Sequence, residues 1–583
     1  MSRTPREAAE AAIAADRAHD DPAIWIARPP DAAILERAAA LEAEGPRGRP
    51  LWGRVFAVKD NIDVAGMPTT AACPGFAYTP AASAPAVAAL EAAGALLLGK
   101  TNLDQFATGL VGTRSPYGVA RNVFDAALVP GGSSSGSGPV VAAGIADFAL
   151  GTDTAGSGRV PAAFGNIVGL KPTPGSISAR GMVPACRSLD TISVFAGSVD
   201  LALAAARAMA GFDAADPFAR RLPWPCPAGA ERTYLDRAAP PPGLRIATAD
   251  IAALCDPAYA GVHAAVASRL GAERVDLSIF FALARELYAG PWVAERSAAL
   301  AGAMAASPDI LHPVTRRILE DGLSRRSVDA FRAFDLLAET RRAAEALFAR
   351  YDAILLPTAP FCPSLAEDRA DPLGPNLRLG TFTNFANLCA MAAIAVPGGF
   401  TPQGLPVGMM VLGPAFSEGR LAGIADAVHR AATDRIGATA TALPQAAAAA
   451  PLGAQEAALF CIGAHMSGLP LNGALTARGG RFLRVAATQP VYRLHALGGR
   501  PGMYRTGGSD GAAIAGEVWA MPLATLGALL AEIPPPLGLG SVLLQDGSCL
   551  GFLAEPVGLA EAPDITACGG WREWLAARRS ATA

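Results

Sequence analysis

The stretch from Gly131 to Lys171 reads GGSSSGSGPVVAAGIADFALGTDTAGSGRVPAAFGNIVGLK, and it decides the fold prediction for this chain. It contains two turns rich in glycine and serine, at residues 131–138 and 151–158, and the residues between them are uncharged apart from Asp147. Glycine allows tight backbone paths and the close approach of other groups. A flexible linker would not alternate with a segment of buried character, so the pattern predicts two loops anchored on a folded core.

The two turns supply the groups that an acyl-transfer site needs. Consecutive N–H groups in glycine-rich turns can converge on an anion, and serine hydroxyls beside them can act as nucleophiles. A single GGSSSGSG motif is more often a plain turn or a linker, and that interpretation stays open for the motif alone. A phosphate-binding loop of the Walker type does not fit, because such a loop continues with Lys and then Ser or Thr, whereas Gly138 is followed by Pro139.

A catalytic serine needs a base, and the usual histidine is missing from this part of the sequence. None of the six histidines lies in or near the two turns, although distance along the chain alone does not exclude one. The Gly-x-Ser-x-Gly motif is also missing, because residues 155–159 read AGSGR. A serine–lysine arrangement is the known alternative. Lys59 follows the apolar run Val55–Val58, so it is expected at the end of a buried strand, where loss of water lowers the pKa of an amine and makes it a usable base.

Three motifs together resemble the amidase signature family: Lys59 in VKDN, Ser133 in GGSSSGS and Ser157 in GTDTAGSGRVPA. They occur in the order and spacing of that family, GLKPT follows them, and the resemblance covers roughly residues 50–430. It implies that Ser157 is the nucleophile, Ser133 a bridging serine after a cis peptide bond, and Lys59 the terminal base. It further implies an oxyanion hole built by the backbone N–H groups of Thr154, Ala155, Gly156 and Ser157.

The motif GKTNLDQF contains a second lysine, Lys100, followed by a stretch that leads towards the site. The resemblance puts Lys100 at the edge of the site and gives it no catalytic role. It implies that Thr108 and Gly109 line the substrate pocket opposite the oxyanion hole.

Tyr288 and Arg296 lie eight residues apart, and Gly290-Pro291 between them interrupts helix continuity. From the residues alone, a solvated helix arginine is the favoured interpretation. Within the amidase signature family, however, allophanate hydrolases have a Tyr and an Arg at this spacing that bind the carboxylate of the substrate. A guanidinium fork matches a carboxylate geometrically, whereas an amidase for neutral amides has no need of one.

Short predicted strands alternate with helices after Lys171, which indicates an α/β fold with helices on both faces of a sheet. The resemblance implies the amidase signature fold, with a central mixed sheet flanked by helices. We expect this amidase domain to span residues 1–440. The segment at residues 25–30 is expected to be a connection between two helices, and the proline-rich segment at residues 213–242 a surface loop.

Residues 441–456 are expected to be a linker, because alanine dominates there and prolines interrupt it. Residues 457–583 are then a small β-rich α+β domain, which resembles the C-terminal domain of allophanate hydrolases with a fold like γ-glutamylcyclotransferases. A lone histidine in a strand and turn is usually packed or hydrogen-bonded. The resemblance nevertheless favours His465 in GAHMSGLPLN as the functional residue, with His495 as the competitor and Glu517 where such folds place an acid.

Composition limits the classes of function. The chain has 583 residues, 51% hydrophobic and 17% charged, with a net charge of −3, so it is globular and shows no basic excess for nucleic acid. Its nine cysteines form no CxxC motif, so zinc is not indicated, and their odd number fits reduced thiols in a cytoplasm. The first residues contain charges and no apolar signal core, so we expect no export, and we expect no membrane partner.

The resemblance implies hydrolysis of allophanate to ammonia and carbon dioxide, by Ser-Ser-Lys amide hydrolysis followed by decarboxylation of N-carboxycarbamate. It implies neither a metal nor an organic cofactor. A homodimer is the default assembly, with association to enzymes of the same pathway as a further expectation. The allophanate could come from urea carboxylation or from s-triazine and biuret breakdown. The alternative is a general amidase or the amidase component of a glutamyl-tRNA amidotransferase, with the C-terminal domain as an assembly module.

Overall fold

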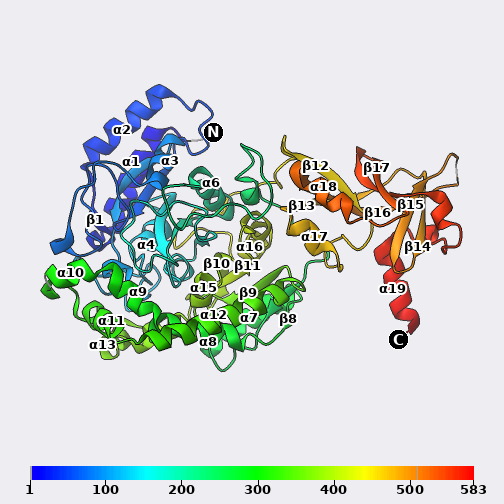
Figure 1. Cartoon of the computed structure of the whole chain (residues 1–583). Coiled ribbons are helices and arrows are strands. Elements are labelled where there is room, and N and C mark those ends of the chain that lie inside the picture. Colours follow the sequence, from blue (N-terminus) through cyan, green and yellow to red (C-terminus); the bar gives the residue numbers. More distant parts are fainter. Residues whose placement is uncertain (1–2, 307, 509, 583) are drawn as a thin grey trace. The chain divides into compact units, whose positions relative to one another are not determined.

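The computed structural model describes residues 3–306, 308–508 and 510–582, and the chain divides into two compact units (Figure 1). The first unit runs to Arg221 and also contains Ile246–Phe348 and Ala353–Ala447. The second unit contains Leu222–Arg245, Ala349–Asp352 and the chain from Ala448 onward. The chain therefore passes between the two units several times.

The first unit is built on an 11-stranded mixed sheet with the order β1-β3-β2-β4-β6-β5-β10-β11-β9-β7-β8. The strands are β1 (Trp25–Ala27), β2 (Val55–Lys59), β3 (Leu96–Thr101), β4 (Phe148–Asp153), β5 (Val168–Lys171), β6 (Thr191–Ala196), β7 (Ile246–Thr248), β8 (Glu273–Arg274), β9 (Ala353–Pro357), β10 (Ala392–Phe400) and β11 (Pro406–Gly413). The mixed sheet confirms the predicted fold class. One local expectation was wrong: β1 lies within the predicted connection at residues 25–30, where it pairs with β3.

Strand directions bring polar residues to one edge of this sheet. β2 and β4 are parallel neighbours, and β4 and β5 are both antiparallel to β6, so the carboxyl ends of β2, β4 and β5 lie at the same edge. Those ends are Lys59, Asp153 and Lys171. Every residue of the three strands is buried. The charged side chains at this edge are therefore held in a largely water-free environment.

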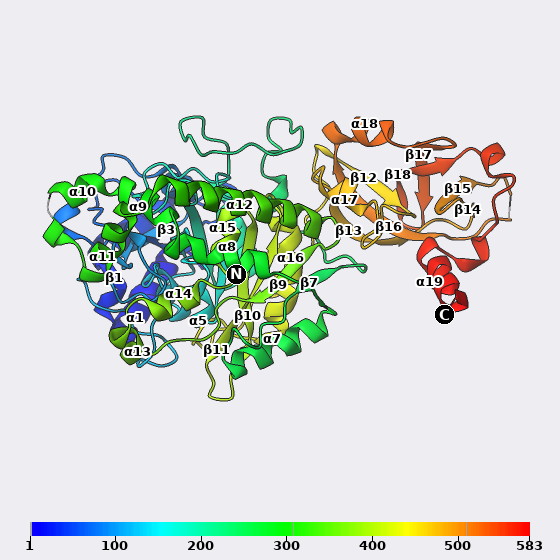
Figure 2. The same ribbon diagram turned by 60° about the horizontal axis from the view of Figure 1, so that its bottom comes forward.

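Two helix pairs pack on the sheet: α6 with α16, both labelled in Figure 1, and α4 with α5, labelled in Figures 1 and 2 respectively. The helices of the first unit are α1 (Pro5–His19), α2 (Asp31–Glu44), α3 (Pro85–Ala92), α4 (Ser137–Ala142), α5 (Val160–Phe164), α6 (Val199–Met209), α7 (Pro257–Arg269), α8 (Ser278–Ala289), α9 (Trp292–Ala299), α10 (Ala301–Ala306), α11 (Pro313–Leu323), α12 (Ser327–Phe348), α13 (Leu365–Ala370), α14 (Gly374–Leu379), α15 (Asn384–Leu388) and α16 (Glu418–Ala432). Among the described residues, no helix combines the length and the apolar character needed to cross a bilayer.

The second unit has a five-stranded sheet with the order β13-β16-β12-β18-β17 and a two-stranded hairpin, β14-β15. Its elements are β12 (Glu456–Cys461), α17 (Asn472–Thr476), β13 (Arg481–Ala487), β14 (Tyr492–Leu497), β15 (Arg500–Arg505), β16 (Ala515–Pro522), α18 (Leu523–Ala531), β17 (Leu537–Leu544), β18 (Gly547–Ala554) and α19 (Trp571–Thr582). Its core gathers apolar side chains from both sheets, including Leu459, Tyr492 and Trp519.

The proline-rich segment at residues 213–242 was expected to be a surface loop, and for its second half this was wrong. Trp224, Tyr234 and Leu235 are buried, and Leu222–Arg245 belongs to the second unit. Trp224 packs so closely on Gly479 that a Cβ there would come within 2.7 Å of the indole. The prolines interrupt regular structure, but the apolar residues between them still have to be buried.

Candidate active site

Lys59 is the last residue of β2 and is completely buried. Its Nζ donates hydrogen bonds to Ser133 Oγ and to Thr152 Oγ1, both at 2.8 Å. Burial lowers the pKa of Lys59 to about 7, against the attraction of Asp104, Asp153 and Asp190, because the ammonium has lost its water. A large fraction of the amine is therefore neutral near neutral pH and able to accept a proton.

Ser133 lies in the loop before α4, after a cis peptide bond from Gly132. Its carbonyl oxygen accepts a hydrogen bond from the Asp104 N–H at 2.9 Å. Gly132 is packed so tightly that a Cβ would lie 2.1 Å from Asp104 Oδ2 and 2.5 Å from Gly112 N. Only glycine fits there, and this close packing fixes Ser133 against the loop at residues 104–112.

Ser157 lies in the turn that connects β4 to α5 and is only 2% exposed. Among the described residues its hydroxyl makes no hydrogen bond, to Ser133 or to any other group. The four backbone N–H groups of residues 154–157 likewise donate to no described group. This turn therefore presents a free hydroxyl beside several unused donors, the arrangement that stabilises an oxyanion.

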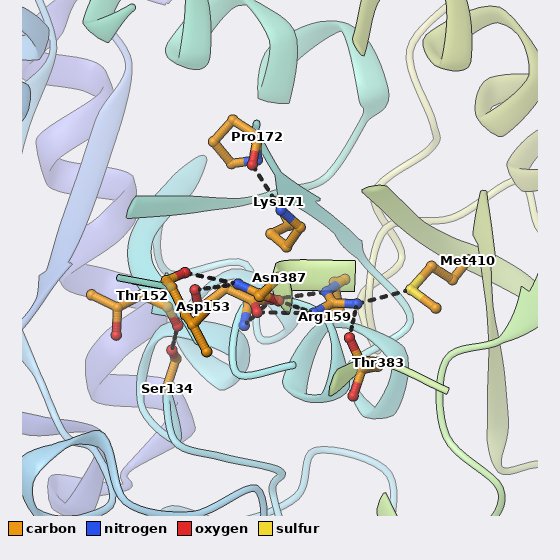
Figure 3. Close-up of polar contacts among 11 residues, drawn as sticks. Ser134, Thr152, Asp153, Arg159, Lys171, Pro172, Thr383, Asn387 and Met410 are labelled. Atoms are coloured by element: carbon orange, nitrogen blue, oxygen red, sulfur yellow. Dashed lines mark hydrogen bonds and ion pairs between the residues drawn. The ribbon is translucent and has the colours of Figure 1, made fainter. Parts of the chain in front are cut away.

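A buried network of polar side chains, which includes Asp153, Arg159 and Asn387, holds the two ends of this turn (Figure 3). The Arg159 guanidinium donates to both carboxylate oxygens of Asp153 at 2.9 Å, and neither side chain is exposed. Asn387 accepts from Arg159 at 2.9 Å and donates to the Asp153 carbonyl at 2.8 Å. Asp153 also accepts from the Gly158 N–H at 3.0 Å. Burial opposes its charge, but Arg159 and these hydrogen bonds hold the pKa of Asp153 below its ordinary value.

The Thr154 side chain anchors the other end of the turn, because its hydroxyl donates to Asp190. Asp190 also accepts from the N–H groups of Ala185 at 2.8 Å and Cys186 at 3.0 Å. Burial raises the pKa of Asp190 to about 6 in spite of these bonds. The sequence motifs do not point to Asp153, Arg159, Asp190 or Asn387. The signal available for the first two was a pair of opposite charges flanking a glycine-rich turn in an otherwise apolar stretch.

Arg296 and Tyr288 lie together, because α8 ends at Ala289 and α9 begins at Trp292. The Arg296 guanidinium carbon is 5.3 Å from the centre of the Tyr288 ring, and both side chains are buried. Among the described residues, the Tyr288 hydroxyl has no hydrogen-bond partner. A buried guanidinium and an unpartnered hydroxyl form a suitable receptor for a carboxylate.

The same arginine joins this pair to the loop that contains Thr108 and Gly109. Arg296 Nη1 donates to Thr108 Oγ1 at 2.8 Å and to the Ala107 carbonyl at 3.1 Å. The structure thus brings Tyr288, Arg296 and Thr108 to one place. Gly109 follows directly, and a Cβ at Gly109 would lie 2.5 Å from Asp104 Oδ2.

Lys100 has a different environment from Lys59. Its Nζ lies 2.9 Å from Asp60 Oδ1, and both side chains are fully buried. It also donates to Thr69 Oγ1 at 2.7 Å and to the Pro68 carbonyl at 2.9 Å. These partners hold the loop after β2 in place, so Lys100 serves the framework of the site.

In the second unit, His465 lines a cavity of about 310 Å³ together with Arg500, Glu532 and Phe552. Its ring stacks on Phe552 with centroids 5.3 Å apart, and burial lowers its pKa. His495 is not among the residues that line this cavity, and its Nδ1 is 2.9 Å from the Ala562 carbonyl.

Glu517 does not line the His465 cavity either. It is buried and accepts hydrogen bonds from the Ser467 N–H and hydroxyl, both at 2.7 Å, and from Trp519 Nε1 at 3.0 Å. Arg572 donates to the same carboxylate at 2.5 Å. These bonds join β16 to the loop after β12 and to α19.

A partly neutral lysine bonded to a serine, in the same unit as a serine turn with free backbone N–H groups, is compatible with an amidohydrolase. Comparison with known proteins agrees with this class. Residues 10–422 match the amidase family, and residues 457–576 match the allophanate hydrolase C-terminal domain. The chain belongs to the amidase family and carries that C-terminal domain.

Individual relatives are similar along different shares of the chain. The solved structure of Kluyveromyces lactis allophanate hydrolase is 35% identical, with a TM-score of 0.74 over 99% of this chain and 97% of that one. Urea amidolyase of Lachancea kluyveri is 38% identical over 579 residues, which are 96% of this chain but only 31% of that protein. A glutamyl-tRNA(Gln) amidotransferase component of Symbiobacterium thermophilum is 37% identical over 435 residues, which are 68% of this chain and 87% of that protein.

Proposed function

We propose that the first unit hydrolyses allophanate at its terminal amide. One observation carries the proposal: a buried Arg296 and an unpartnered Tyr288 hydroxyl lie in the same unit as the Lys59–Ser133 pair. An amidase for neutral substrates would have no use for a buried cation at its substrate pocket. The similarity to an allophanate hydrolase over nearly the whole of both chains supports the same substrate.

In the proposed mechanism, neutral Lys59 accepts a proton from the Ser133 hydroxyl as Ser133 takes the proton of Ser157. The Ser157 oxygen attacks the terminal amide carbonyl, and the developing oxyanion is bound by the N–H groups of residues 154–157. One well-placed donor of this kind changes the rate by about two to three orders of magnitude. The proton returns to the leaving nitrogen, ammonia departs, and water then hydrolyses the acyl-enzyme to release N-carboxycarbamate.

For the substrate end, we propose that Arg296 and Tyr288 bind the carboxylate of allophanate, while Thr108 and Gly109 line the opposite wall. The Arg296 guanidinium is already fixed by Thr108 and Ala107, so binding requires little further ordering.

We assign decarboxylation of N-carboxycarbamate to the second unit, with His465 as the functional residue. Its cavity, which also contains Arg500, supports this assignment over His495. The corresponding division into an amidase domain (residues 1–440), a linker (441–456) and a C-terminal domain (457–583) is part of the same proposal, with Leu222–Arg245 and Ala349–Asp352 packed as part of the second unit. If this domain is an assembly module instead, His465 variants will lose association and keep decarboxylation.

A general amidase or a component of a tRNA-dependent amidotransferase is the second candidate, favoured by the 37% identity to the Symbiobacterium thermophilum protein. That similarity covers about two thirds of the chain and gives no function to the second unit.

We further propose a cytoplasmic homodimer that works beside enzymes of the same pathway. The nine cysteines, all free in this structure, and the longer urea amidolyase relatives support these assignments. Urea carboxylation and s-triazine or biuret breakdown are the two candidate sources of the substrate.

The test measures ammonia release from allophanate, acetamide and biuret by the wild type, Ser157→Ala and Arg296→Ala. We expect Ser157→Ala to lose activity on every substrate and Arg296→Ala to lose it chiefly on the anion. Comparable turnover of acetamide and allophanate, indifferent to Arg296, would leave the serine chemistry intact and refute the substrate.

A further inference from the structure

A cavity of about 680 Å³ lies in the first unit, beside the residues that support the turn at residues 154–157, which we call the oxyanion turn. Three arginines line it, Arg187, Arg220 and Arg341, and two residues that support the turn, Asp190 and Asn387, line it as well. Lys59, Ser133, Ser157 and Arg296 are not among its lining residues, so this cavity is distinct from the proposed catalytic groups.

None of the three arginines has a carboxylate partner among the described residues. Arg341 donates through Nε and Nη2 to the Leu388 carbonyl, at 3.2 and 2.8 Å. The guanidinium carbons of Arg220 and Arg187 lie over aromatic rings, 5.5 Å from Phe416 and 5.6 Å from Phe218. Elsewhere in this unit arginines pair with acids even on the surface, as Arg326 does with Asp329.

The two acidic residues that line the cavity, Asp190 and Glu345, have other partners. Asp190 accepts from the Thr154 hydroxyl and from two backbone N–H groups. Glu345 pairs with Arg342 at 2.7 Å. Desolvation, and after it the repulsion by Arg341, lower the pKa of Arg220, against the attraction of the buried Glu418, so Arg220 and Arg341 are close enough to repel each other. The lining of the cavity therefore carries three guanidinium groups against two carboxylates and, in the described structure, no arginine of the three forms an ion pair with either.

We propose that this cavity is a binding site for a small anion with several carboxylate or phosphate groups, held by Arg187, Arg220 and Arg341. Guanidinium groups match both kinds of oxyanion geometrically. The cavity volume leaves room for a ligand larger than a single phosphate. The backbone at Arg220 is held in place, because the Arg220 N–H donates a hydrogen bond to the Gly175 carbonyl at 2.8 Å.

The proposed anion site lies against residues that hold the turn carrying Ser157. Asp190 holds Thr154 and Asn387 holds the Asp153–Arg159 pair, so both residues join the wall of the cavity to the turn that carries Ser157. An occupant therefore contacts the support of the oxyanion turn and leaves the Arg296 pocket free.

The test is calorimetric titration of the full chain with inorganic phosphate and, separately, with citrate; the tighter probe identifies the kind of oxyanion preferred. We expect saturable binding of at least one probe. The Arg220→Ala/Arg341→Ala double variant should weaken it by about tenfold or more. Arg220→Glu, which leaves the Arg341–Leu388 contact in place, should cause the same loss.

The matched control is Arg326→Ala/Arg332→Ala, which removes two exposed arginines near and on α12 and should bind as the wild type does. Arg296→Ala should also keep the affinity. Three results overturn the proposal: no saturable binding of either probe up to about 10 mM, unchanged binding in the double variant, or loss of binding in Arg296→Ala, which would place the anion in the catalytic pocket. None of these readouts depends on the substrate proposed above.

Discussion

Arg159 donates to both oxygens of Asp153 at 2.9 Å, and neither side chain touches solvent. Removing one partner of such a pair leaves the other as an uncompensated buried charge, which costs about 3–5 kcal/mol. We expect Arg159→Met to lower the free energy of unfolding of the first unit by this amount and to reduce activity with it. Urea titration measures the change. The control Arg342→Met breaks an exposed pair with Glu345 and should cost less than about 1 kcal/mol; equal effects of the two variants would contradict the argument.

The pH dependence of hydrolysis should report Lys59. Its folded-state pKa is lowered to about 7, so the amine is protonated and inactive below that pH and neutral above it. We therefore expect kcat/KM on allophanate to rise with pH, with an acidic limb centred near 7. The same shift makes the folded protein bind fewer protons than the unfolded chain between about pH 7 and the ordinary lysine value, so Lys59 adds stability as pH rises through that window. A rate that is flat from about pH 6 to about pH 8 would rule out a lysine base.

Tyr288→Phe removes the hydroxyl that we propose binds the substrate carboxylate. In the described structure this hydroxyl makes no hydrogen bond of ordinary geometry, although Arg296 lies beside it and stabilises its charged form, so its loss disturbs few contacts of the free protein. A hydrogen bond to a carboxylate contributes about 1.5–3 kcal/mol, so we expect kcat/KM for allophanate to fall roughly 10- to 150-fold. The value for acetamide should stay within about twofold. Tyr78→Phe, whose hydroxyl donates to Asp63, is the control and should leave both values unchanged. A uniform loss on both substrates would argue against carboxylate binding.

His465→Ala should separate the two reactions. Because His465 is in the second unit, we expect ammonia release by the first unit to persist while conversion of N-carboxycarbamate to carbon dioxide slows about 100-fold. ¹³C NMR of labelled allophanate follows the intermediate directly. His495→Ala serves as the matched control and should leave both steps unchanged. Slowing in His495→Ala in place of His465→Ala would reverse the assignment.

Glu517→Gln should act on stability and leave chemistry alone. The carboxylate accepts from Ser467, Trp519 and Arg572 and is not among the residues that line the His465 cavity. We expect the melting temperature of the second unit to fall, with decarboxylation by the remaining folded protein unchanged. Calorimetry and the NMR measurement together distinguish this from a catalytic role, which would slow decarboxylation without a shift in melting.

The proposed triad could be predicted from the sequence because Lys59, Ser133 and Ser157 each lie in a recognisable local motif. The mixed sheet followed from the same resemblance, and the structure confirms it. Asp190 and Asn387 could not be found this way, since their contacts with the oxyanion turn join residues 36 and 234 positions apart. Such partners are fixed by strand order, which local patterns do not encode.

The arginine-lined cavity shows the same limit. Arg187, Arg220 and Arg341 occur in three separate segments with no common motif, and only the folded chain brings them together. Trp224 and Tyr234 illustrate the opposite error, because prolines around them suggested exposure while their own apolar surfaces required burial.

The division of the chain between the two units has a practical consequence. Leu222–Arg245 and Ala349–Asp352 belong to the second unit, although first-unit sequence precedes and follows each of them. A protease that cuts near Ala448 would thus yield two fragments on a denaturing gel, while the nicked protein would still elute as one species. A gene fragment that begins at residue 457 would encode a domain lacking the strap with Trp224, which fills the space against Gly479. The C-terminal domain is consequently completed by residues that the amidase sequence supplies.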